Sequence, residues 1–214
     1  MRETATSTEA KTGLEEPAVA DMAAFPVPAE RAMRADARRN RERILAAARL
    51  AYAEHGRDVQ IDEIADRAGV GVGTLYRHFP TKTALAGALA REHFESLCAI
   101  AERAAGSAGT PGERFESLIW DAARLAERDA AIAEVLAGEP EVFDYVQKPL
   151  GRLQGLTAQL VDAAVASGEL RPDASGDDIP AIMCGLGQVI STSGLRPGAG
   201  WERYLTIVLD GMRA

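Results

Sequence analysis

Cysteine is scarce in this sequence, and long apolar runs are missing from it. The two cysteines, Cys98 and Cys184, are far apart and lack the spacing of metal ligands. This excludes a disulfide framework and favours a reducing, cytoplasmic location, with both side chains expected to be small and buried. No run approaches the roughly 18 apolar residues needed to cross a bilayer, and acidic residues interrupt the first thirty positions. We therefore expect neither a membrane span nor a secretory signal.

The motifs of common catalytic and cofactor-binding sites are also absent. The glycines of residues 69–73 follow a helical segment rather than a strand and lack the G-x-G-x-x-G spacing, which excludes a dinucleotide-binding turn. Neither a phosphate-binding loop ending in G-K-S/T nor a G-x-S-x-G elbow is present. The histidines, His55, His78 and His93, are not spaced as zinc ligands. The sequence therefore predicts no enzyme, no metal and no cofactor.

Positive charge is confined to one part of an acidic chain. The net charge is −8, yet residues 31–104 hold 13 Lys and Arg against 10 Asp and Glu, whereas residues 1–30 and 105–214 are both acidic. A cluster of five arginines opens the first predicted helix, at Arg34, Arg38, Arg39, Arg41 and Arg43. Each contact of such a side chain with a phosphate adds a salt-dependent attraction that ignores base sequence. The charge distribution is compatible with nucleic-acid binding by this segment.

Helical periodicity extends over most of the chain. From residue 34 onward, apolar residues recur at steps of three and four, and the alternation typical of strands is missing, so the predicted fold is all-α. Residues 1–33 lack periodicity, and we expect a disordered tail there. The remainder divides into a helix-turn-helix domain at 34–80, a connecting helix at 81–104, and a larger helical domain at 105–214. Helices are predicted at residues 34–55, 61–68, 72–79, 81–104, 113–128, 130–138, 142–167, 177–192 and 201–213.

Two short helices meeting at residues 68–70 have the arrangement of a helix-turn-helix, in which the second helix enters the major groove. The first has an apolar stripe made of Ile61, Ile64, Ala65 and Ala68. In the second, Leu75 and Phe79 are predicted to face the core, and Pro80 ends the helix. The outward residues that donate hydrogen bonds to phosphates or base edges are Thr74, Tyr76, Arg77 and His78.

Residues 69–82, GVGVGTLYRHFPTK, resemble the signature of the tetracycline-repressor (TetR) family of regulators. The resemblance covers about residues 38–100, including ILAAA at 44–48 and IDEIA at 61–65. Residues 168–173, GELRPD, are similar more loosely to a connector that precedes the dimer helices in some members. The resemblance implies a sequence-specific DNA-binding transcriptional regulator, a repressor that a small-molecule inducer releases. It also implies that the larger helical domain at 105–214 is a ligand-sensing and dimerisation domain.

The resemblance also implies roles for individual residues at the DNA. Val72 and Gly73 would lie against bases at the start of the reading helix, and Lys82 would hold a phosphate. Many members have Ser or Thr where Gln60 stands, and that hydroxyl both caps the helix and meets a phosphate, so the capping contribution is in doubt here. The residues expected at the DNA are Arg38, Arg39, Gln60, Val72, Gly73, Thr74, Tyr76, Arg77, His78 and Lys82.

A homodimer built from the last two helices is the assembly that the resemblance implies. The apolar periodicity of these helices supports it independently, since both carry stripes at helical spacing. The predicted interface residues are Ile179, Ile182, Met183, Leu186, Val189, Ile190, Trp201, Tyr204, Leu205, Val208 and Met212. A two-fold dimer would prefer a near-palindromic double-stranded DNA operator.

The inducer site is the least determined feature of the sequence. Ligand cavities are mostly apolar with a few polar groups, and such residues occur throughout the larger domain. The candidates are Phe94, Leu97, Trp120, Arg124, Phe143, Tyr145, Met183 and Gln188, most of which also suit an ordinary core.

Two other functions remain open: activation instead of repression, and a helical ligand-binding or scaffold protein whose basic segment contacts proteins.

Overall fold

The computed structural model describes residues 28–130, 140–192 and 200–214, and their regular structure is helical. Apart from one isolated antiparallel bridge between Leu170 and Arg213, these residues contain no β-structure, which confirms the all-α prediction. Within the same ranges, no helix has both the length and the apolar character required to span a membrane. Residues 28–37, the first turns of the first helix, form a unit of their own, and the contacts below belong to residues 38–214.

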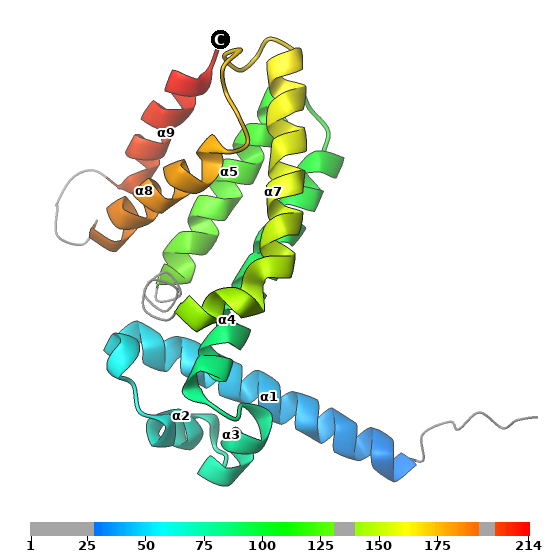
Figure 1. Cartoon of the computed structure of the whole chain (residues 1–214), viewed down its shortest axis with the longest axis vertical. Helices are drawn as coiled ribbons and strands as arrows, with labels where there is room; N and C mark the ends of the chain where they lie inside the picture. The colour runs from blue at the N-terminus through cyan, green and yellow to red at the C-terminus, as the bar shows by residue number, and fades with distance from the viewer. Residues whose placement is uncertain (1–27, 131–139, 193–199) are drawn as a thin grey trace, which may run out of the picture. The chain divides into compact units, whose positions relative to one another are not determined.

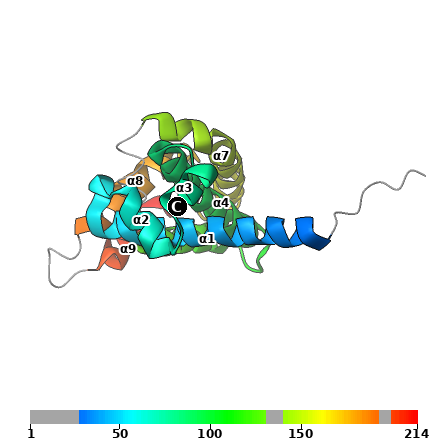
Figure 2. The same cartoon turned by 90° about the horizontal axis from the view of Figure 1, so that it is seen from below.

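The helix-turn-helix lies where the sequence predicts it. Its elements are α1 (Pro28–His55), the short 3-10 helix η1 (Gly56–Asp58), α2 (Ile61–Ala68) and α3 (Val72–His78). The helix α1 begins six residues earlier than expected, because its first turns lack the apolar periodicity used to place it. Residues 28–33 are therefore helical rather than part of the predicted tail, and residues 1–27 lie outside the described range. In Figure 2, which views the molecule from below, α2 and α3 lie on the near side.

The turn between α2 and α3 depends on Gly69. This residue has a φ of 62°, the left-handed conformation that glycine adopts without strain, and its N–H bonds back to Ala65 and Asp66. A Cβ at this position would lie 2.5 Å from Nη2 of Arg43. That guanidinium donates a hydrogen bond to the Gly69 carbonyl at 3.2 Å, so α1 holds the turn directly.

A long helix, α4 (Lys82–Gly106), continues from α3 into the rest of the protein. Phe79 is extended and Pro80 cannot continue α3, so the chain turns before Thr81, whose hydroxyl accepts from the N–H of Ala84 at 3.0 Å. Figure 1 shows α4, in green, leading from α3 to the bundle of the remaining helices. These are α5 (Pro111–Arg128), η2 (Pro140–Val142), α7 (Phe143–Ala166), α8 (Asp178–Thr192) and α9 (Trp201–Met212). The helix predicted at 130–138 falls almost entirely outside the described residues.

Two hydrophobic clusters organise the chain, and α4 contributes to both. In the first cluster, Leu85 and Leu89 of α4 are buried with the apolar faces of α1, α2 and α3. In the second cluster, Ala101 of α4 is buried with side chains of α5, α7, α8 and α9. The buried stripe of α4 thus passes from one cluster to the other. The first cluster also includes Val142 and Val146, at the η2–α7 junction. The start of α7 therefore packs with the helix-turn-helix, although the sequence assigns it to the larger domain.

The contact between α4 and α7 is especially close at Gly87. A Cβ on Gly87 would lie 2.4 to 2.9 Å from ring carbons of Tyr145, so only glycine fits there without displacing the ring. Further along the same pair of helices, the buried thiol of Cys98 donates to the carbonyl of Pro149 at 3.3 Å, and burial raises the pKa of that thiol. The other cysteine, Cys184, is exposed rather than buried as expected.

Replacing Leu75 tests how firmly α3 is held. Leu75 is fully buried, so Leu75→Ala is expected to lower the free energy of unfolding by about 2 to 5 kcal/mol through lost burial and a cavity. The matched control is Tyr76→Ala, at a neighbouring residue that is 46% exposed, and it should lower the free energy of unfolding much less. Urea denaturation followed by circular dichroism measures both. Equal losses would contradict the anchoring role of Leu75.

Candidate nucleic-acid interface

The helix α3 presents one polar face to solvent. Leu75 is buried in the first cluster, while Tyr76, Arg77 and Gly73 are exposed. A Cβ on Gly73 would meet no atom within 4 Å, so its backbone is open to close approach. The half-buried residues of the helix are Val72, Thr74 and His78. The predicted reading residues thus lie together on one short helix, and the donors among them suit phosphates and base edges.

Lys82 has a structural role that the sequence did not reveal. Its ammonium donates to the carbonyls of Arg57 and Val59, each at 2.7 Å, and so fixes η1 and the residue that follows it to the first turn of α4. An ammonium has three donors, and the contact with a phosphate predicted for Lys82 therefore depends on the third. No local signal in the sequence pairs residue 82 with residues 57 and 59.

Gln60 occupies the N-cap position of α2 without capping it through its side chain. Its amide nitrogen donates instead to the carbonyl of Asp58 at 2.8 Å. The residue is exposed, as a contact with DNA requires, but the first turn of α2 lacks the hydroxyl cap that Ser or Thr would supply. The departure from the family pattern therefore removes a cap from α2.

The arginines of α1 divide into two groups. Arg38 and Arg39 are exposed, and the Arg38 Nε lies 3.5 Å from Glu42 in a solvated pair of little energetic weight. Arg43 bonds to the turn at Gly69, and the guanidinium of Arg41 lies 5.1 Å from the centroid of the Phe79 ring. These last two side chains hold the ends of α2 and α3, so only part of the basic segment is left for a nucleic acid.

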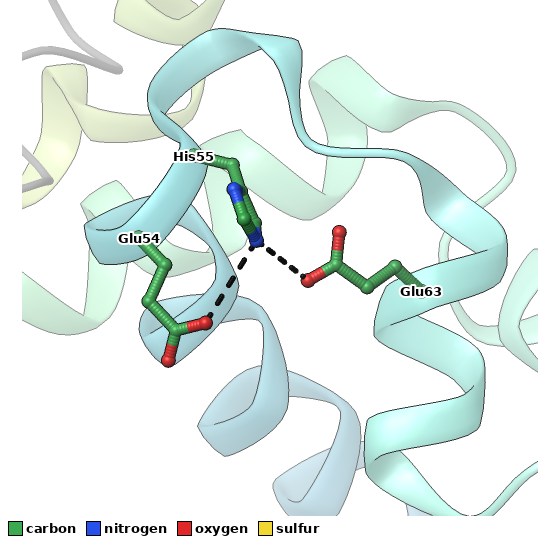
Figure 3. Close-up of side chains that lie close together, drawn as sticks. All are labelled: Glu54, His55 and Glu63. Atoms are coloured by element: carbon green, nitrogen blue, oxygen red, sulfur yellow. Dashed lines mark ion pairs between the residues drawn. The ribbon is translucent and has the colours of Figure 1, made fainter.

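An ion-pair cluster fastens α2 to the end of α1. Arg67 donates to both carboxylate oxygens of Glu54, at 2.8 and 2.7 Å, and to Glu63 at 3.0 Å. Nε2 of His55 lies 3.2 Å from Glu63 and 3.8 Å from Glu54, and Figure 3 shows the imidazole between the two carboxylates. Two carboxylates and an imidazole this close together form a set of potential metal ligands. Arg67 already neutralises both carboxylates, so a metal ion would have to displace its guanidinium.

The predicted ligand residues lie in different surroundings. Phe143 and Tyr145 are exposed at the start of α7, Gln188 is exposed on α8, and Phe94 packs against the first cluster. Those packed against the second cluster are Leu97, Trp120 and Met183. Arg124 is exposed and lies over the ring of Trp120, with 5.9 Å between guanidinium carbon and ring centroid. Sequence pattern alone does not distinguish a cavity wall from ordinary core.

Many of the predicted dimer residues are buried within the chain itself. Trp201 packs against Trp120 and donates from its indole nitrogen to Glu127 of α5 at 2.8 Å. The other buried members are Ile179, Leu186, Leu205 and Met212. Those left partly or largely accessible are Ile182, Met183, Val189, Ile190, Tyr204 and Val208. Ile207, which the sequence analysis did not select, is 55% exposed on the same helix as Tyr204.

The cluster around Arg67 makes part of the stability depend on acid. The hydrogen bond from Arg67 is the main reason that the pKa of Glu54 lies below its usual value. The contribution of ionised Glu54 to the free energy of unfolding is complete at a pH above the ordinary pKa of a glutamate. It is lost as the pH falls through the lowered pKa. The Glu54→Gln variant should therefore lose less stability on acidification than the parent protein. Urea denaturation midpoints, measured at a series of pH values that spans the pKa of Glu54, test this expectation.

Asp66→Asn provides the control for this comparison. Asp66 is an exposed carboxylate of α2, the helix that carries Arg67, with no ion pair among the described residues, so its variant should keep the acid dependence of the parent. Superimposable curves for the Glu54→Gln variant and the parent would refute the stabilising role of the cluster.

Comparisons with known proteins agree with this geometry. The model of the tetR family of bacterial regulatory proteins matches residues 44–89, which include α2 and α3. The HTH-type transcriptional repressor KstR of Mycolicibacterium smegmatis is 38% identical over 113 residues, which are 51% of this chain and 55% of that protein. KstR of Mycobacterium tuberculosis is 32% identical over 151 residues, covering 69% of this chain and 68% of the relative. The chain thus spans about half of the first relative and about two thirds of the second.

Solved structures extend the likeness over most of the chain. The TetR transcription regulatory protein from Mycobacterium vanbaalenii is 32% identical with a TM-score of 0.61, covering 85% of this chain and 99% of that one. The TetR regulator SCO0520 from Streptomyces coelicolor is 34% identical with a TM-score of 0.59, covering 81% and 98%. These proteins are named as regulators, which agrees with the expectation that the chain is not an enzyme. With its helix-turn-helix, its all-helical remainder and these relatives, the chain belongs to the tetR family of bacterial regulatory proteins.

Proposed function

We propose that the chain binds an operator as a homodimer, represses transcription there, and leaves the DNA when a small molecule binds its larger helical region. The exposure of Tyr76 and Arg77 beside the buried Leu75 carries this proposal, since it holds donor groups outward on a rigidly packed helix. The helix-turn-helix relatives, which are named repressors, support the same reading.

On the DNA, α3 enters the major groove. Val72 and Gly73 approach base edges with little steric bulk, while the donors of Thr74, Tyr76 and Arg77 bind bases or phosphates. His78 contributes from the end of the helix. Arg38, Arg39, Gln60 and Lys82 add contacts to the backbone of the duplex, which fix the register without reading sequence.

The proposed dimer uses the accessible side of α8 and α9. On α9, Tyr204 is 36% exposed and Ile207 55% exposed, and they lie three residues apart on one face. The partly buried residues of α8, including Met183 and Ile190, extend this apolar surface. A two-fold pairing here presents two copies of α3 to half-sites about 34 to 36 Å apart, or a multiple of this distance.

Release by an inducer follows from the continuity of α4. A molecule bound among partly buried side chains around the second cluster, such as Leu97, Trp120 and Met183, would move the later part of α4. The first part is packed with α1 and α3, so the displacement changes the spacing of the two reading helices. A hundredfold release requires about 2.7 kcal/mol of preference by the inducer for the unbound state.

Arg77→Ala tests the DNA interface. Fluorescence anisotropy with a duplex from upstream of the coding sequence should show affinity reduced by about tenfold or more, because a charge-assisted contact is lost. If Arg77 contacts a phosphate, the slope of log affinity against log salt also falls by about one. Lys148→Ala, which removes a positive charge from the exposed side of α7, is the control. Absence of duplex binding by the parent at low salt would favour a scaffold or ligand-binding protein instead.

Ile207→Glu tests the dimer. A charge placed in a buried apolar interface is costly, so the variant is expected to sediment as a monomer at concentrations where the parent is a dimer. Thr206→Glu adds the same charge at the adjacent exposed position and should leave the assembly intact. A dimer that persists in the Ile207→Glu variant would place the interface elsewhere.

A further inference from the structure

A polar cleft of about 690 Å³ lies between α1, α4 and the end of α5, apart from the proposed DNA interface. Its wall includes Arg41 and Arg49 from α1, Arg91 and Glu92 from α4, and Arg128 and Asp129 at the end of α5. A smaller cleft of about 380 Å³ shares Arg128 with it and adds Arg103 and Arg124. Six arginines therefore line adjoining hollows in a chain that is acidic overall.

The carboxylates of the main cleft are already paired with cations. Glu92 lies 3.3 Å from Arg49 and 3.7 Å from Arg41. Asp129 is buried and lies 3.2 Å from His93, 3.5 Å from Arg128 and 3.6 Å from Arg49. Burial alone would raise the pKa of Asp129, but the hydrogen bond with His93 and the charge of Arg49 outweigh it and lower the pKa. The acids thus serve to fix the arginines in place.

Several of the arginines have N–H groups that are exposed at the cleft. The side chain of Arg128 is 71% exposed, and that of Arg91 is 61% exposed with its Nε 3.9 Å from Glu95. Glu95 is shared with Arg152, whose Nη1 is 3.5 Å away. Within the described ranges, Arg103 makes no hydrogen bond or ion pair. The cleft therefore has cationic donors that its own carboxylates do not saturate.

The inner wall of the cleft contains two buried polar atoms that are not hydrogen-bonded. The Nε of Arg49 and the Oδ1 of Asp129 have no hydrogen-bond partner among the described residues and lie 3.6 Å apart, too far for a bond between them. Buried polar atoms are normally hydrogen-bonded. A donor and an acceptor that are ion-paired but lack hydrogen bonds therefore indicate a position for a group that both accepts and donates, such as a hydroxyl.

We infer that this cleft binds a small anion that carries phosphate or carboxylate groups, held by Arg91 and Arg128 at the opening and reaching Arg49 and Asp129 inside. Guanidinium groups form bidentate, charge-assisted bonds with both kinds of anion. Any regulatory effect rests on the proposed function. Because Arg49 belongs to α1 and Arg128 to α5, a bound anion would bridge the helix-turn-helix to the larger helical region.

Calorimetric titration of the full chain with inorganic pyrophosphate at low ionic strength tests the inference. The parent should bind one pyrophosphate per chain, and the double variant Arg91→Gln with Arg128→Gln should bind at least about tenfold more weakly, since two charge-assisted contacts are removed. Lys148→Gln removes a positive charge outside the cleft and should leave binding unchanged. A parallel titration with citrate distinguishes phosphate from carboxylate recognition. Both altered arginines are largely exposed, and circular dichroism verifies that the double variant is folded.

Three results would overturn the inference. The first is a parent that binds neither anion, and the second is a folded double variant that binds as tightly as the parent. The third is a double variant whose DNA affinity, measured without added anion, is lower and depends less steeply on salt, because the arginines would then contact the duplex. Failure of the proposed function looks different: the parent binds pyrophosphate but no DNA.

Discussion

The arrangement of this protein depends on the continuity of α4 through two hydrophobic clusters. Leu85 and Leu89 are buried with the helix-turn-helix, and Ala101 and Ala104, four to five turns later, are buried with the remaining helices. Protein interiors are packed as tightly as organic crystals, so neither end of α4 can shift without moving its neighbours. The start of α7 adds a second connection, because Val142 and Val146 lie in the first cluster. Any change in the larger helical region is therefore mechanically linked to α3.

Polar contacts around the helix-turn-helix complement this packing. Arg43 bonds to the α2–α3 turn, Arg67 ties α2 to α1, and Lys82 joins the start of α4 to η1. Each contact joins parts of the chain between 13 and 26 residues apart. A motif of short helices has little internal stability, since most helical stability in proteins comes from tertiary packing. Basic side chains in this region thus keep the motif rigid as well as making its surface positive.

Local patterns predicted most of the fold, and long-range contacts account for what they missed. The stripes of α2 and α4, the glycine at position 69 and the cap at Thr81 all act through neighbours within about four residues, so the sequence displays them directly. The packing of Val142 on the first cluster, the bonds of Lys82 and the burial of Trp201 against α5 join distant segments, and no short-range pattern encodes them. The arginine cleft was missed for the same reason, since three separate helices supply its wall. The exposed polar face of α3 was the easiest to predict, because one helix carries it.

The close approach at Gly87 limits how the protein can move. The ring of Tyr145 occupies the space that any larger side chain at position 87 would need, which leaves no clearance between α4 and α7 at this point. Sliding of one helix past the other would drive the ring into the backbone of its neighbour. Any sliding of α4 along α7 at this point therefore requires the ring of Tyr145, which is 42% exposed, to swing toward solvent first.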